Sequence, residues 1–213
     1  MKQLDLNTSI RAALAHRILS ALENATPNST AQLRGSLAEE RADAYSDIDV
    51  FWEVPDELFQ KSIDGIAAVL ANAHRIASIR SAPEFQNSDR RRLIFVQFED
   101  MPLFWRADID IFARSVHQDL AYDLHNEAAK GDNWSLTHSA LMNAVAAVKA
   151  LLRHEEDTAE QLLIRGFERV GLVTPEGSSD ELILELNRSI AEMDSTQVAL
   201  THRITELHQQ VFG

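Results

Sequence analysis

Two pairs of aspartates are the residues in this sequence best suited to chemistry. Asp47 and Asp49 alternate with apolar residues in DIDVFWEV, and Asp108 and Asp110 do the same in RADIDIF. Residues two apart on a β-strand project to the same face, so each pair presents its carboxylates together. If the two strands are neighbours, three or four carboxylates meet on one patch of sheet, where like charges raise one another's pKa. A divalent cation relieves this repulsion, and an all-oxygen ligand set suits Mg²⁺ or Mn²⁺ better than zinc.

Gly35 and Ser36 supply the complementary half of such a site. A glycine lets a ligand approach the backbone closely, and the amides at the start of a following helix point toward an anion. The hydroxyl of Ser36 adds a donor to a phosphate. Ser46, directly before Asp47, is a second candidate donor, or equally a cap of the helix or strand. Carboxylates that hold metal and face an anion-binding segment describe a site for a nucleoside triphosphate with its magnesium ions.

The elements that must position these residues occupy the first half of the chain. Three segments have apolar residues at helical spacing: 5–24, 37–45 and 56–73. Four segments have the composition of strands: 31–35, 47–54, 91–99 and 103–113. The last two are joined by a short polar turn, which favours a hairpin. Between them and the second full helix, residues 75–89 combine a short strand with a loop.

Past Ser115 the sequence changes character, and no segment is typical of a strand. Helical spacing is found at 134–154, 155–170 and 181–212, with a loop rich in glycine and proline before the last segment. We therefore predict an α+β fold. A small mixed β-sheet with flanking helices would occupy residues 1–115, and an all-helical C-terminal domain would occupy residues 116–213.

The composition limits the classes of protein. The 213 residues contain no cysteine, which excludes disulfide scaffolds, thiolate metal sites and cysteine nucleophiles. The N-terminal segment is amphipathic and interrupted by charges, so we expect neither a signal peptide nor a membrane span, and a soluble, cytoplasmic protein. The formal net charge of −13 repels a phosphate backbone and favours cationic partners. Nucleic acid is therefore an unlikely partner, although a local basic patch such as residues 90–92 could override the average.

Residues 34–50, RGSLAEERADAYSDIDV, resemble the signature of the nucleotidyltransferase superfamily. This superfamily includes DNA polymerase beta, poly(A) polymerases and antibiotic nucleotidyltransferases. Its signature is a Gly-Ser pair, a spacer that ends in a polar residue, and then Asp-apolar-Asp-apolar, with a third carboxylate on a later strand. The resemblance covers residues 30–115, and the second half of the chain resembles the family only in being helical.

The resemblance implies roles for individual residues. Gly35 and Ser36 would contact the β- and γ-phosphates of the nucleotide. Asp47 and Asp49 would hold two Mg²⁺ ions, for which Mn²⁺ is an alternative. Asp108, in an Arg-apolar-Asp-apolar context, would complete the second metal site and help to deprotonate the acceptor.

Three further residues are candidates at or near this site. Asp110 departs from the family pattern, which usually has one carboxylate on this strand, and we prefer Asp108 as the third carboxylate. Lys149 is a candidate for contact with the triphosphate, because superfamily members often use a basic residue from the helical half. The alternative is a lysine that extends from the flank of a helix into water. Arg106, two residues before Asp108, is a candidate to pair with a carboxylate.

The function that follows is nucleotidyl transfer, with AMP from ATP favoured, to a hydroxyl of a small-molecule acceptor such as an aminoglycoside antibiotic. Pyrophosphate would be released by a two-metal mechanism. Two alternatives remain open. One is a regulatory module that nucleotidylates a partner protein, as in a toxin–antitoxin pair. The other is a non-catalytic protein that binds nucleotides.

Overall fold

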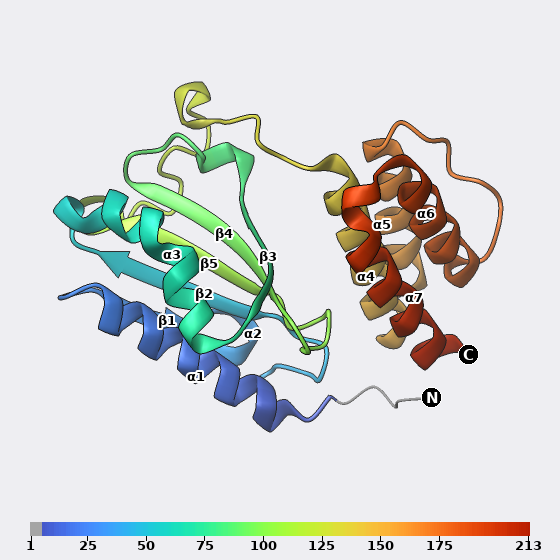
Figure 1. Cartoon of the computed structure of the whole chain (residues 1–213), viewed down its shortest axis with the longest axis horizontal. Coiled ribbons are helices and arrows are strands. Elements are labelled where there is room, and N and C mark those ends of the chain that lie inside the picture. The colour runs from blue at the N-terminus through green and yellow to red at the C-terminus, as the bar shows by residue number, and fades with distance from the viewer. Residues whose placement is uncertain (1–5) are drawn as a thin grey trace. The chain divides into compact units, whose positions relative to one another are not determined.

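The computed structural model describes residues 6–213, which form two compact units, Leu6–Trp134 and Ser135–Gly213. The first unit is built on a five-stranded mixed sheet (Figure 1). Its strands are β1 (Thr30–Leu33), β2 (Ile48–Val54), β3 (Ile76–Ser81), β4 (Arg91–Phe98) and β5 (Ala107–Ala113). The strand order is β1-β2-β5-β4-β3, with β2 and β5 parallel and the other neighbours antiparallel. The predicted α+β class and the β4–β5 hairpin are confirmed.

Two helices cover one face of this sheet, as Figure 1 shows: α1 (Thr8–Ala25) and α3 (Phe59–Ala73). Alternate residues of β2 and β5, among them Val50 and Ile109, point to these helices and belong to the core. Full burial of such a side chain contributes about 1.5–3 kcal/mol. The side chain of Asn7 caps α1 by accepting a hydrogen bond from the amide of Ser9. Asp5, where we expected this helix to begin, lies outside the described residues.

The residues between β1 and β2 differ from the prediction. The helix expected over 37–45 is a single turn, α2 (Gly35–Ala38), and Glu40 has a left-handed φ of 55°. Beyond it, the carboxylate of Asp43 accepts hydrogen bonds from the Tyr45 amide and the Ser46 hydroxyl. Aspartate competes for the backbone in this way and favours a turn over a helix. The approach to β2 is therefore a loop held by side chains.

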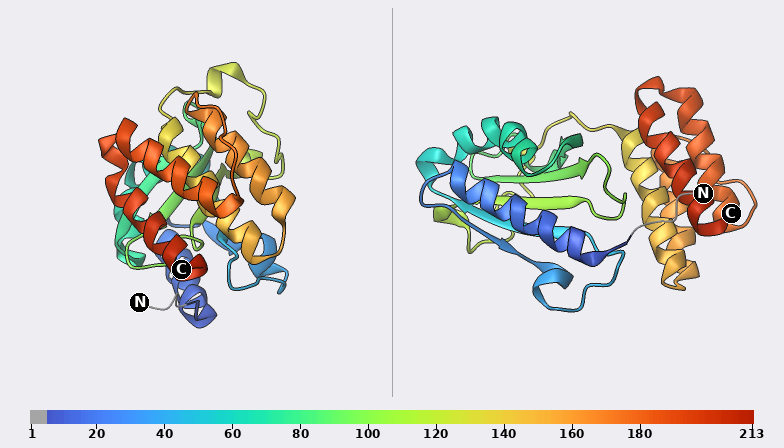
Figure 2. Two further views of the ribbon diagram at one scale, coloured as in Figure 1. Left: turned by 90° about the vertical axis from the view of Figure 1, so that its right-hand side faces the viewer. Right: turned by 60° about the horizontal axis from the view of Figure 1, so that its bottom comes forward.

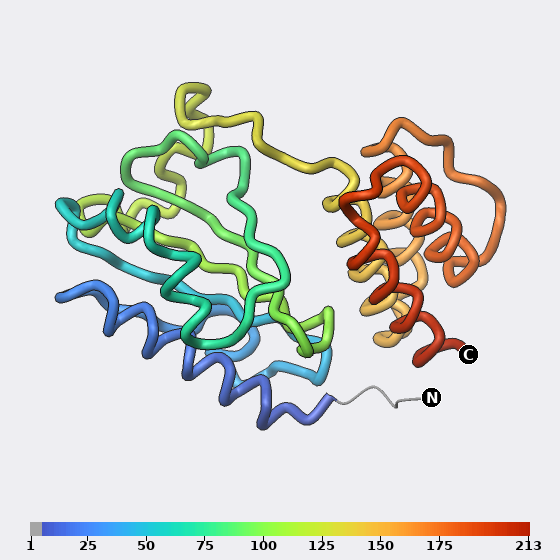
Figure 3. Tube along the Cα trace, in the orientation of Figure 1, coloured from blue at the N-terminus to red at the C-terminus, as the bar shows by residue number. Residues whose placement is uncertain are grey.

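The boundary between the two units lies at residues 134 and 135 rather than at the expected 115 and 116. Figure 3 shows the long irregular trace that follows β5. This segment belongs to the first unit because hydrogen bonds connect the two. The guanidinium of Arg91 donates to the carbonyls of Leu120 and Tyr122, and the amide of Asn87 donates to Ala129 O. Residues 116–134 contain no helix longer than one short 3-10 turn. Such a segment has no periodic pattern of apolar residues, so the sequence did not show to which unit it belongs.

The second unit consists of helices that pack side by side (Figure 2). They are α4 (Leu136–Leu152), α5 (Glu156–Arg169), α6 (Ser179–Met193) and α7 (Val198–Phe212). The helical region expected over 181–212 is interrupted at Asp194. The carboxylate of Asp194 accepts hydrogen bonds from the hydroxyl of Thr137 and from the amide of Thr196, and so caps the short turn before α7.

Membrane-spanning character is absent from the helices of residues 6–213, none of which is both long enough and apolar enough to cross a bilayer.

Candidate active site

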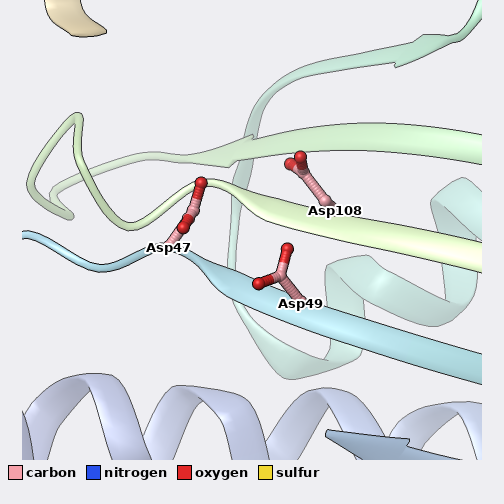
Figure 4. Close-up of side chains that lie close together, drawn as sticks. All are labelled: Asp47, Asp49 and Asp108. Atoms are coloured by element: carbon pink, nitrogen blue, oxygen red, sulfur yellow. The ribbon is translucent and has the colours of Figure 1, made fainter. Parts of the chain in front are cut away.

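Three carboxylates meet on the sheet face opposite α1 and α3. Asp49 and Asp108 are direct register partners on the parallel strands β2 and β5, and Asp47 lies one residue before β2. One oxygen from each of the three side chains lies within 4.8 Å of the others. Figure 4 shows the side chains projecting from adjacent strands into one shared space. The predicted neighbourhood of the two aspartate pairs is therefore present in the fold.

Asp47 is positioned by a buried arginine that the sequence patterns did not single out. Arg11, on α1, is only 3 % exposed, and its guanidinium donates to the carbonyls of Asp43 and Ser46. Burial lowers the pKa of Arg11, while the nearby carboxylates of Asp43 and Asp47 raise it, with a net lowering. From the other side, the indole of Trp105 donates to Ala44 O at 2.9 Å. These bonds fix the loop that delivers Asp47 to the start of β2.

Gly35 lies directly against the carboxylates. Its φ of 59° is in the left-handed region that favours glycine. The amide of the preceding residue, Arg34, donates to Asp49 O at 2.8 Å, which ties the end of β1 to β2. A Cβ atom at Gly35 would lie 2.4 Å from Oδ2 of Asp49. The backbone of Gly35-Ser36 thus approaches the carboxylates as closely as a glycine allows.

Arg106 balances part of the negative charge. Its Nε and Nη2 atoms each donate to one carboxylate oxygen of Asp108 at 2.5 Å. Burial by itself lowers the pKa of Arg106, but the carboxylates of Asp108, Asp47 and Asp49 outweigh it and the pKa is raised. The predicted pairing of Arg106 with a carboxylate is therefore present. One guanidinium thus lies beside three carboxylates, which leaves negative charge in the cluster for a cation to neutralise.

Asp110 lies on the same strand face but outside this cluster. Both of its carboxylate oxygens accept hydrogen bonds from Arg91, at 3.2 and 3.1 Å. The guanidinium of Arg91 is stacked over the rings of Phe85 and Phe112, and its side chain is only 9 % exposed. Burial raises the pKa of Asp110, and the hydrogen bonds from Arg91 lower it in part. The geometry gives Asp110 a structural partner and leaves Asp108 beside Asp47 and Asp49.

The remaining candidates have different surroundings. The hydroxyl of Ser46 is buried and donates to the Asp43 carboxylate at 2.8 Å, so it serves the turn before β2. Lys149 lies on α4 in the helical unit. Contacts from Ser46 or Lys149 to a nucleotide stay predictions.

The donor set suits a hard divalent cation. Asp47, Asp49 and Asp108 offer only oxygen ligands, and each is half-buried. Magnesium prefers such carboxylates and completes its shell with water and substrate phosphates. These three residues are the ones in the described part of the chain that could hold a metal as a group.

No family model matches the sequence, and no curated protein matches it. The chain is similar to several solved structures, among them the following three. In the GLD-2/RNP-8 complex, the match has 13 % identity and a TM-score of 0.39, and covers 87 % of this chain and 74 % of that chain. For the Cid1 poly(U) polymerase the identity is 15 %, the TM-score 0.37 and the coverage 86 % and 48 %. For the polymerase core of TRAMP, an RNA surveillance complex, the identity is 13 % and the TM-score 0.36, and the match covers 93 % of this chain and 56 % of that chain.

The chain thus spans about half the length of the Cid1 and TRAMP chains. These identities and TM-scores are low, and the indications of function come from the residues of the site. Those residues are a Gly-Ser pair against Asp49 and carboxylates on β2 and β5 of a mixed sheet. This is the arrangement that the resemblance of residues 34–50 to the nucleotidyltransferase superfamily implies.

Proposed function

We propose that the chain is a nucleotidyltransferase that depends on a divalent metal and transfers a nucleoside monophosphate to an acceptor hydroxyl. AMP from ATP is the favoured group. The observation that carries the proposal is the contact between the two halves of the site. Gly35 lies against Asp49, and Asp49 faces Asp47 and Asp108 within one small space. A triphosphate bound at Gly35-Ser36 therefore has the carboxylates beside it.

Asp47, Asp49 and Asp108 would hold Mg²⁺ or Mn²⁺. Bound there, the metal would stabilise negative charge on the attacking and leaving oxygens. The residues of the chain supply position and charge. Gly35-Ser36 would anchor the β- and γ-phosphates, and Arg106 orients Asp108 through two hydrogen bonds.

The reaction is an in-line substitution at the α-phosphorus. The acceptor oxygen forms a bond to this phosphorus while the bond to the pyrophosphate oxygen breaks. The hydroxyl proton passes to a carboxylate of the site, for which Asp108 is the candidate, and then to solvent. Pyrophosphate leaves with the bonding electrons.

The acceptor is proposed as a hydroxylated small molecule. The net charge of −13 is compatible with a cationic acceptor such as an aminoglycoside, but an average over the whole chain does not describe the charge beside the site. A partner protein and a role without catalysis are alternatives that the same assay separates.

The test is release of pyrophosphate with each nucleoside triphosphate in turn, with Mg²⁺ or Mn²⁺, and with a panel of acceptors. The panel contains aminoglycosides, nucleosides, short RNA and candidate partner proteins. We expect turnover that requires metal and is lost in Asp47→Asn. The matched control is Asp100→Asn, at an exposed aspartate paired with Arg75, which should behave as wild type. Absence of both turnover and metal-dependent nucleotide binding would overturn the proposal.

A further inference from the structure

The sheet continues past Asp108 with a row of residues on the same face. Asp108 is the register partner of Phe95 on β4, and Phe95 is the register partner of Arg80 on β3. The row therefore runs from Asp49 through Asp108 to Phe95 and Arg80 across four neighbouring strands. Its outer residues, Phe95 and Arg80, have no role in the proposed metal and phosphate contacts.

Aromatic rings and guanidinium groups in and beside this outer part are in contact with one another. The Cζ atom of Arg106 lies 4.8 Å from the ring centroid of Phe95. The ring of Trp134 meets Phe95 edge to face, with centroids 6.0 Å apart, and the Cζ atom of Arg80 lies 4.6 Å from the Trp134 ring. All four side chains are half-buried. We call Arg106, Phe95, Trp134 and Arg80 the stacking platform.

Trp134 is held in place by its own loop. Gln86 accepts a hydrogen bond from the Asn133 amide at 3.1 Å and donates one to the Asn133 carbonyl at 2.6 Å. The Gly131 amide donates to Pro83 O at 2.8 Å, and a Cβ atom at Gly131 would lie 2.2 Å from Oε1 of Gln86. The ring therefore has a fixed attachment to the β3–β4 connection, as a binding surface requires.

The direction of attack in the proposed reaction indicates which substrate lies at the stacking platform. In an in-line substitution the attacking oxygen enters on the side of the phosphorus opposite the leaving group. The leaving pyrophosphate would lie at Gly35-Ser36, which contacts Asp49 from the β1 side. The acceptor therefore comes from the opposite side, past Asp108, where the platform lies.

Aromatic rings and guanidinium planes bind planar rings by stacking. Building on the proposed function, we propose that the acceptor is a nucleoside unit whose base stacks on the platform and whose ribose hydroxyl is directed to Asp108. The unit is either a free nucleotide or the 3′ end of an RNA strand.

The experiment measures acceptor binding apart from catalysis. The nucleotide site is first filled with Mg²⁺ and an ATP analogue whose α- and β-phosphates are joined by a methylene group, so that no transfer occurs. AMP or a short oligoadenylate with a free 3′ hydroxyl is then titrated while tryptophan fluorescence is recorded. Of the three tryptophans, Trp52 and Trp105 are at most 1 % exposed, so quenching reports on Trp134.

We expect saturable quenching, and binding by equilibrium dialysis about ten-fold weaker in Phe95→Ala and Trp134→Ala. Trp134→Phe should retain most of the affinity. The control is Phe212→Ala, at a partly exposed aromatic residue of the helical unit, which should bind as wild type. Tighter binding of AMP identifies a free nucleotide as the source, and tighter binding of the oligonucleotide identifies an RNA end.

The proposal is overturned if neither probe binds, or if both bind equally well to wild type and to the two alanine variants. It is also overturned if an aminoglycoside is the acceptor and its KM is unchanged in Trp134→Ala. The ATP analogue must bind each variant as it binds wild type, which shows that the variant is folded. Failure of the analogue to bind wild type would contradict the proposed function itself, whereas binding of the analogue without acceptor binding contradicts only the platform.

Discussion

Gly35 and Asp49 are in such close contact that no larger residue can stand at position 35 without a shift of the carboxylate. The atom that a side chain would add lies 2.4 Å from Oδ2 of Asp49, and the φ of 59° disfavours any residue with a Cβ. This contact places the proposed phosphate-binding backbone against the first pair of carboxylates.

Gly35→Ala should therefore impair both stability and activity. The left-handed φ alone costs about 1–2 kcal/mol for a residue with a side chain. Displacement of Asp49 by a distance on the order of 1 Å should lower kcat/KM by about 100-fold. Denaturant unfolding and steady-state kinetics measure the two effects. Wild-type activity in this variant would show that the contact is unimportant for the reaction.

Asp108→Asn and Asp110→Asn should have opposite consequences. Asp108→Asn removes a proposed metal ligand and should lower activity by more than about 100-fold, while the weakened pair with Arg106 is offset in stability by relief of the repulsion from Asp47 and Asp49. Asp110→Asn weakens the buried pair with Arg91 and should cost about 1–3 kcal/mol of stability, with activity retained where the protein is folded. Both variants are compared by kinetics and by urea unfolding at one temperature. Equal loss of activity in the two would refute the preference for Asp108.

A pH dependence of stability is expected from Asp56. Hydrogen bonds from the side chain of Ser115, and then the nearby Arg90, lower the pKa of Asp56, against a smaller opposing effect of burial. A lowered folded-state pKa stabilises the fold above the unfolded pKa and loses that effect as pH falls through the folded value. The stability difference between wild type and Asp56→Asn should thus be present at neutral pH and shrink below about pH 4. Urea unfolding between pH 2 and 7 measures it, with Glu57→Gln as control, and a difference that is constant over this range would contradict the assignment.

Two helical glycines offer a matched pair for stability. No atom lies within 4 Å of a Cβ added at Gly65 in α3, so Gly65→Ala should raise the free energy of unfolding by about 0.5–1 kcal/mol through its higher helix propensity. At Gly166 in α5 the added atom would lie 2.6 Å from Leu186, so Gly166→Ala should gain less or be destabilising. Thermal unfolding of both variants checks the comparison, and a larger gain at Gly166 would contradict the packing described for the helical unit.

The parts of the structure that could be predicted are those governed by local pattern. The period of two predicted strands over residues 47–54 and 103–113, which the structure has as β2 and the shorter β5, and it placed their aspartates on one face. The apolar spacing of residues 56–73 gave α3 close to its observed bounds. These regularities arise from burial of one face, which leaves a record in the order of apolar and polar residues.

What could not be predicted depends on single side chains that act over long sequence distances. Arg11 holds the loop before Asp47 from a helix more than thirty residues earlier, and an arginine in an amphipathic helix has no feature that predicts burial. Asp43 stops the helix expected over 37–45 through its own hydrogen bonds. Trp134 meets Phe95 from a segment without periodicity, which the pairing of Gln86 with Asn133 helps to hold. Likewise, the hydrogen bond from Arg91 to Asp110, which distinguishes Asp110 from Asp108, could not be predicted from the sequence.

Asp47, Asp49 and Asp108 are proposed to bind a metal together with a nucleoside triphosphate held at Gly35-Ser36. Calorimetric titration of ATP into the protein with and without Mg²⁺ tests this most directly, for wild type, Asp49→Asn and the exposed control Asp100→Asn. We predict binding that requires Mg²⁺ in wild type and the control, and its loss in Asp49→Asn. Binding that ignores Mg²⁺, or that persists unchanged in Asp49→Asn, would contradict it.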